Sequence, residues 1–95
     1  MPIVWIEDAL SRIARGEAHS VTSEGLRVRL ADAPGFAPGD EVTLRVSFER
    51  GAPTIATTGS VRLVERGADG IEVGLVWSAP KGARRELDAW LARAA

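Results

Sequence analysis

Apolar and polar residues alternate strictly in the segment Gly25-Leu-Arg-Val-Arg-Leu-Ala31. In an extended strand, successive side chains point to opposite faces. The apolar side chains of Leu26, Val28 and Leu30 therefore face one way, and the two arginines face the other. This pattern predicts a strand with one buried face and one face in solvent.

Three further segments toward the C-terminus show strand character. Residues 41–49 and 71–77 place an apolar residue at every second position, and residues 54–65 are rich in threonine, isoleucine and valine. Two Pro-Gly pairs after residue 31 and an Asp-Gly pair before residue 71 indicate the turns between them. The spacing predicts an antiparallel meander of four strands, which needs closure or a covering helix to bury its apolar face.

The two ends of the chain show a period closer to that of a helix. Near the C-terminus the period predicts an amphipathic helix over about residues 81–94, packed on the sheet through the side chains of Ala83, Leu87, Trp90, Leu91 and Ala94. Near the N-terminus, apolar pairs recur every four residues, which favours a helix. The alternation of residues 2–6 fits a strand hairpin as well, so the residues alone leave both structures open for residues 2–14.

The composition limits the classes of function. The 95 residues suffice for a single domain, 1–95, with one modest core. Twelve Lys and Arg against 13 Asp and Glu give a net charge of −1, which disfavours nucleic-acid binding through bulk electrostatics. With no cysteine and a single histidine, His19, we predict no metal site and no catalytic residues. Because no leader or membrane-spanning segment is visible, we expect a cytoplasmic protein without membrane insertion.

Residues 20–77 carry short motifs in a characteristic order. They are Ser20-Val-Thr-Ser-Glu-Gly25, then Phe36-Ala-Pro-Gly-Asp-Glu-Val-Thr-Leu44, then Gly59-Ser-Val-Arg-Leu-Val64 and Gly70-Ile-Glu-Val-Gly-Leu-Val-Trp77. In order and spacing they resemble the PilZ domain, the bacterial receptor module for cyclic di-GMP. The resemblance implies an all-β fold with one helix: a six-stranded antiparallel barrel over about residues 2–77 and a C-terminal helix. It also implies that residues 2–7 and about 12–21 are the first two strands.

The chain departs from the family pattern at the ligand site. The family binds its nucleotide with an R-x-x-x-R segment ahead of the first strand and a D/N-x-S-x-x-G segment after the second. Here Met1-Pro2-Ile3 stands where the arginine segment would already have ended, and Ser20 replaces the Asp or Asn. A serine hydroxyl is a shorter, uncharged and poorer acceptor. We therefore expect a degenerate member that does not bind cyclic di-GMP directly.

Three hypotheses about function follow. The leading one is a non-catalytic adaptor domain without a cofactor, which binds a protein partner in bacterial signalling; the resemblance implies motility, pili, exopolysaccharide or biofilm. The alternative is a cyclic di-GMP receptor with non-standard arginines, whose ligand-binding residues would be Arg12, Arg15, Ser20, Thr22, Gly25 and Arg27. A small nucleic-acid-binding barrel comes third, because the isoelectric point near 5.8 and the absence of tyrosine disfavour it.

The three tryptophans bear on the partner surface. Tryptophan is enriched at the energetic centres of interfaces, so an exposed one would mark a docking surface. We expect Trp77 to end a core strand and Trp90 to seat the helix on the barrel, and we leave the role of Trp5 open.

Overall fold

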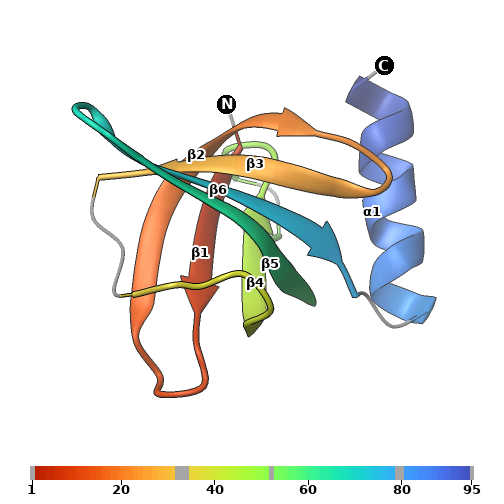
Figure 1. The fold of residues 1–95 in the computed structure, drawn as a ribbon. Coiled ribbons are helices and arrows are strands. Elements are labelled where there is room, and N and C mark those ends of the chain that lie inside the picture. The colour runs from red at the N-terminus through yellow and green to blue at the C-terminus, as the bar shows by residue number, and fades with distance from the viewer. Residues whose placement is uncertain (1, 32–34, 52, 79–80, 95) are drawn as a thin grey trace.

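Six strands and one helix make up the fold (Figure 1). The computed structural model describes residues 2–31, 35–51, 53–78 and 81–94. The elements are β1 (Ile3–Glu7), β2 (Ile13–Val21), β3 (Gly25–Leu30), β4 (Glu41–Ser47), β5 (Ile55–Gly67), β6 (Gly70–Trp77) and α1 (Lys81–Ala94). This arrangement confirms the all-β fold with one C-terminal helix.

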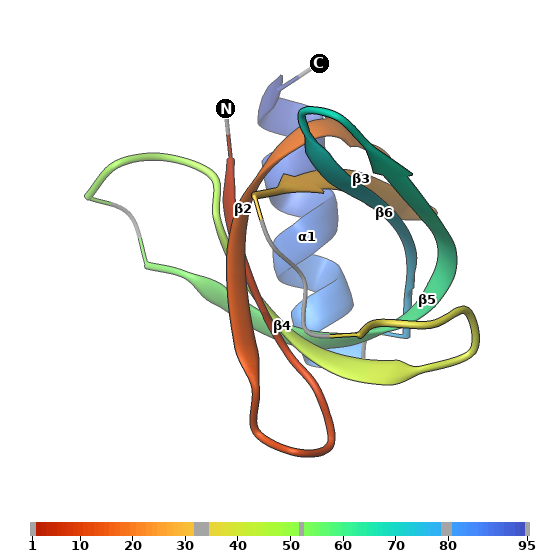
Figure 2. The ribbon, with the colours of Figure 1, turned by 60° about the vertical axis from the view of Figure 1, so that its left-hand side comes forward.

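The strands close into an antiparallel barrel in the order β1-β2-β3-β6-β5-β4 (Figure 2). The first two strands form the hairpin that the family resemblance implies, and the helical period near the N-terminus does not correspond to a helix. Val4 and Ile6 point into the barrel and are fully buried. The turn between β1 and β2 then restarts the alternation, so that Ala14 and Ala18 also point inward. The apparent four-residue period is thus a strand alternation interrupted by a turn.

The predicted meander is wrong in its strand order. A meander would pair β3 with β4, whereas β3 pairs with β6, and β4 pairs with β1 and β5. The connection before β4 explains the difference: it contains Phe36, which is buried in the core, and its last residues are hydrogen-bonded to the middle of β5. There the Gly39 N–H donates to the Val61 carbonyl and the Val61 N–H donates to the Asp40 carbonyl, each at 2.8 Å. The chain thereby enters β4 on the far side of β5, and the sheet closes.

The boundaries of two strands differ from the sequence prediction. β4 ends at Ser47 instead of residue 49, and Phe48 is half-buried beyond it. β5 runs on to Gly67, so that the turn before β6 contains only Ala68 and Asp69. This extension is paired with the start of β6, where Gly67 lies opposite Gly70. The longer hairpin projects from the body of the barrel (Figure 1).

Helix α1 stands across one end of the barrel in both views (Figures 1 and 2). Leu87 is fully buried in the same core cluster as the inward residues of the strands. The rings of Trp90 and Phe48 are stacked, with centroids 5.6 Å apart and planes inclined by 9°. Leu91 is half-buried, and the predicted contacts of Ala83 and Ala94 involve side chains that lie outside the described part of the structure. The helix therefore covers the barrel mainly through Leu87 and Trp90.

Candidate functional site

The segment that resembles the nucleotide-binding motif forms the turn between β2 and β3. Ser20 lies opposite Arg27, and Arg27 lies opposite Gly74 on β6. A shallow hollow of about 250 Å³ lies here on the outside of the barrel. The structure thus brings together four of the six predicted ligand-binding residues. The hollow is lined by Ser20, Thr22, Glu24, Gly25, Leu26, Arg27, Arg62, Gly74, Leu75 and Val76.

Thr22 stabilises this turn through all of its polar groups. Its hydroxyl accepts from the backbone N–H groups of Glu24 and Gly25, at 3.2 and 3.3 Å, and donates to the Gly25 carbonyl at 3.3 Å. Its own N–H donates to the same carbonyl at 2.8 Å. The Trp77 indole donates to the Thr22 carbonyl at 2.9 Å, and the Trp77 N–H donates to the Glu24 carbonyl at 3.0 Å. Local hydroxyl-to-backbone bonds of this kind define a tight turn.

Gly25 is required by the close approach of two strands. A Cβ atom at this position would lie 2.0 Å from the carbonyl oxygen of Leu75 and 3.1 Å from the Cα of Val76, both on β6. Backbone atoms held in a barrel cannot move aside as the end of a flexible side chain can. The glycine of the motif is therefore explained by β3–β6 packing, without a ligand.

Charged side chains from four strands meet beside the hollow. The Arg27 guanidinium lies 3.6 Å from Glu72 and 3.8 Å from Glu65, and the other carboxylate oxygen of Glu72 contacts His19. Exposed ion pairs at such distances are weak, but they partly neutralise Arg27. Arg62 lines the same hollow and has no ion-pair partner among the described residues. Arg62 is therefore the least engaged cation of this site.

Arg62 is not among the ligand-binding residues that the sequence predicts. The pairing of β5 with β6 shifts between Val61 and Leu63, so Arg62 occupies a bulge and has no partner residue on β6. A bulge re-aims a side chain in this way. Gly59 lies three residues earlier, and a glycine inside a strand is a sequence signal for a bend or bulge nearby.

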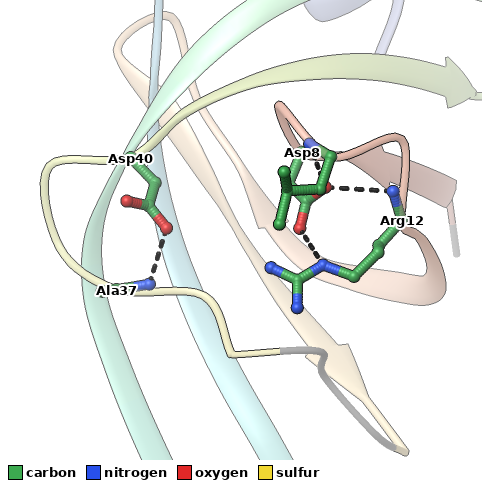
Figure 3. Close-up of polar contacts among 5 residues, drawn as sticks. Asp8, Arg12, Ala37 and Asp40 are labelled. Carbon is green, nitrogen blue, oxygen red and sulfur yellow. Dashed lines mark hydrogen bonds and ion pairs between the residues drawn. The ribbon is translucent and has the colours of Figure 1, made fainter.

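Arg12 lies far from this hollow, in the β1–β2 turn (Figure 3). Its guanidinium Nε lies 2.7 Å from the Asp8 carboxylate, which also accepts from the N–H groups of Leu10 and Arg12 at 2.9 and 3.0 Å. Eight residues of extended chain separate Arg12 from Ser20, a span of about 26 Å. Arg15 lies near the start of β2 and lines a different hollow, with His19 and Arg29. The structure does not bring Arg12 or Arg15 to the motif turn.

The pKa of Asp8 reflects these contacts. Desolvation of the carboxyl group by itself raises its pKa. The hydrogen bonds from Arg12 and Leu10, together with the positive charge of Arg12, outweigh that effect and hold the pKa of Asp8 below its ordinary value. The ionised carboxylate thus holds the turn together.

A second turn is held in the same way. The Asp40 carboxylate accepts from the Ala37 N–H at 3.0 Å (Figure 3), and the Asp40 N–H donates to the Ala37 carbonyl at 3.1 Å. Gly39 has a φ of +98°, which favours glycine. The Pro-Gly-Asp motif before β4 is therefore explained by the turn that it forms.

Among the described residues, no three His, Asp or Glu side chains lie close enough together to hold a metal ion. No helix in the described ranges is both long and apolar enough to span a membrane.

Comparison with known proteins identifies the family. A family model for the PilZ domain matches residues 5–93. Among solved structures, the chain is similar to the Bacillus subtilis inhibitor of motility (MotI/DgrA), with a TM-score of 0.79 and 21% sequence identity. The match covers 98% of this chain and 46% of that one, so the chain spans less than half of its length. At this identity the likeness shows a shared fold. The search of curated proteins found no match.

Proposed function

The chain belongs to the PilZ domain family, and from this premise we propose that it is a non-catalytic adaptor that binds a protein partner in bacterial signalling. PilZ domains are generally binding or adaptor domains. We favour a motility pathway because the similar solved structure is that of an inhibitor of motility; pili, exopolysaccharide and biofilm pathways are the alternatives. The proposal includes that this domain does not bind cyclic di-GMP directly and acts in the cytoplasm.

The observation that carries the proposal is the engagement of the motif turn with the barrel itself. The hydroxyl and carbonyl of Thr22 are hydrogen-bonded within the fold, and Gly25 is required by strand packing. Arg27 is shared between two glutamates, which leaves Arg62 as the one cation of the hollow without a described partner. A hollow of about 250 Å³ is also smaller than the ~300–1,000 Å³ of usual small-molecule sites. These features support a structural role for the motif.

A cyclic di-GMP receptor is the second candidate. Arg27 and Arg62 line the same hollow, together with Gly74. Guanidinium groups can both pair with phosphates and stack on bases. In that case Arg27 would have to exchange Glu65 and Glu72 for the ligand. The third candidate, a nucleic-acid-binding barrel, is disfavoured because glutamates alternate with these arginines on the outer face.

An affinity capture from the native host tests the adaptor function. The tagged chain is incubated with lysate, with and without added cyclic di-GMP, beside an Arg27→Gln/Arg62→Gln double variant. We expect the same partner to be captured by both proteins under both conditions. Capture that requires the nucleotide and is lost in the double variant would favour the receptor. If neither protein captures a partner above the untagged control, the adaptor proposal fails.

A further inference from the structure

A tryptophan lies between two arginines on the outer face of the barrel. Trp5 on β1 is directly opposite Arg15 on β2 and directly opposite Arg45 on β4. Val4 and Ile6 point inward, so Trp5 points outward and is half-exposed, while both arginines are exposed. We call the three residues the Trp5 row.

The groups of the Trp5 row are not engaged within the described part of the chain. There, neither guanidinium has an ion pair, and the Trp5 indole has no hydrogen bond or ring partner. The other tryptophans differ, since Trp77 donates to the Thr22 carbonyl and Trp90 stacks on Phe48. Trp5 is therefore the one tryptophan whose aromatic face and N–H are available to a partner, together with two guanidinium donors.

Two exposed apolar side chains lie beyond this row, toward the end of the β1–β2 hairpin. Ile13 is 62% exposed and Leu10 is 73% exposed, although both are large and hydrophobic. A hollow of about 450 Å³ lies here, and it is lined by Trp5, Glu7, Ile13, Thr43, Arg45 and Thr54. Its volume falls within the range of sites that accept several side chains or a small ligand.

The charges around the row define what can bind. Two residues before Trp5 on β1, Ile3 lies opposite Glu17. Two residues after Trp5, Glu7 lies opposite Ile13 and Thr43. These paired residues form the neighbouring rows on the outer face, and each row contains a glutamate. Each neighbouring row thus places a carboxylate beside the two arginines of the Trp5 row. Neighbouring strands lie about 4.8 Å apart, so the Cα atoms of Arg15 and Arg45 are about 10 Å apart and both side chains can reach one carboxylate above Trp5. A polyanion would meet Glu7 or Glu17, whereas a single acidic group would not.

We propose that the Trp5 row and Ile13 dock an extended segment of the partner protein in which one Asp or Glu is followed by an aliphatic or aromatic residue. The inference rests on the adaptor function proposed above. The acidic side chain pairs with Arg15 and Arg45, and the apolar one packs on Trp5 and Ile13 beside Leu10. Because the six strands close into a ring, the segment is recognised by side chains and does not extend the sheet as a further strand.

A displayed library of random heptapeptides tests the surface. Selection on the wild-type chain is expected to enrich peptides with one acidic residue next to an apolar one. Trp5→Ala should weaken a selected peptide at least tenfold, and Arg45→Gln about three- to tenfold. The matched control, Arg62→Gln, removes the same charge from another strand and should change the affinity less than twofold. All three side chains lie on the outer face, and thermal unfolding verifies that the variants fold.

Two results of the peptide selection would overturn the inference. One is a selection that enriches nothing, or only basic or polyacidic peptides. The other is binding that Trp5→Ala and Arg45→Gln leave unchanged. If the captured partner of the wild-type chain is also captured by Trp5→Ala, the docking surface lies elsewhere while the adaptor function stands. If no partner is captured at all, the adaptor proposal fails by itself.

Discussion

Replacement of Gly25 by alanine separates a structural role of the motif glycine from a role in ligand binding. The new Cβ would lie 2.0 Å from the Leu75 carbonyl oxygen, so β3 and β6 would have to move apart by more than about 1 Å to restore van der Waals contact. Loss of two backbone hydrogen bonds costs about 1–3 kcal/mol. Overpacking adds about 1–3 kcal/mol. We expect the free energy of unfolding of Gly25→Ala to fall by about 2–6 kcal/mol.

Urea unfolding monitored by tryptophan fluorescence measures this loss. With a slope of about 2 kcal/mol per molar, the midpoint should fall by about 1–3 M urea. Gly67→Ala is the matched control: Gly67 is also in a strand, but the nearest atom to its Cβ would be 3.9 Å away. Its midpoint should stay within about 0.3 M of wild type. If Gly25→Ala is as stable as Gly67→Ala, the packing explanation of the motif is wrong.

Three further substitutions test other parts of the structure. Leu87→Ala should lower the free energy of unfolding by about 2–5 kcal/mol in thermal or urea unfolding, because Leu87 is fully buried between helix and barrel. Thr57→Val should raise it by about 1 kcal/mol, because the Thr57 hydroxyl is buried without a hydrogen-bond partner and valine has the same shape. Asp8→Asn should be less stable than wild type near neutral pH. Since the pKa of Asp8 is lowered in the fold, its contribution is present above about pH 4 and is lost as pH falls through the folded-state pKa, so the two unfolding curves should converge in acid.

The strands after residue 24 could be predicted from the sequence because their residue patterns are local. The alternation in residues 25–31 and 71–77 requires only that one face be buried, and both segments are strands. The order of strands in the sheet could not be read in this way. It depends on the chain before β4 crossing to β5 through the Gly39 and Asp40 backbone bonds, which are not encoded in any local period. The family resemblance was needed to decide that residues 2–7 form a strand.

The site could be predicted only in part, for a related reason. Ser20, Thr22, Gly25 and Arg27 are close in sequence, and one turn brings them together. The residues that decide the chemistry of Arg27 come from β5 and β6, so Glu65 and Glu72 could not be assigned to it from spacing. Arg62 depends on a bulge, and the Trp5 row depends on the pairing of β1 with β4.

Calorimetric titration with cyclic di-GMP tests the central claim most directly. The chain at about 100 μM is titrated beside Arg27→Gln and Arg62→Gln. Each charged contact to a phosphate is worth about 1.5–3 kcal/mol. With Arg27 shared between two glutamates and Arg62 alone, a site that would be micromolar with two free arginines should weaken about tenfold to a hundredfold or more. Cyclic di-GMP should therefore show no dissociation constant tighter than about 10 μM in any of the three proteins. A dissociation constant of a few micromolar that is lost in either variant would contradict the account and identify the domain as a receptor.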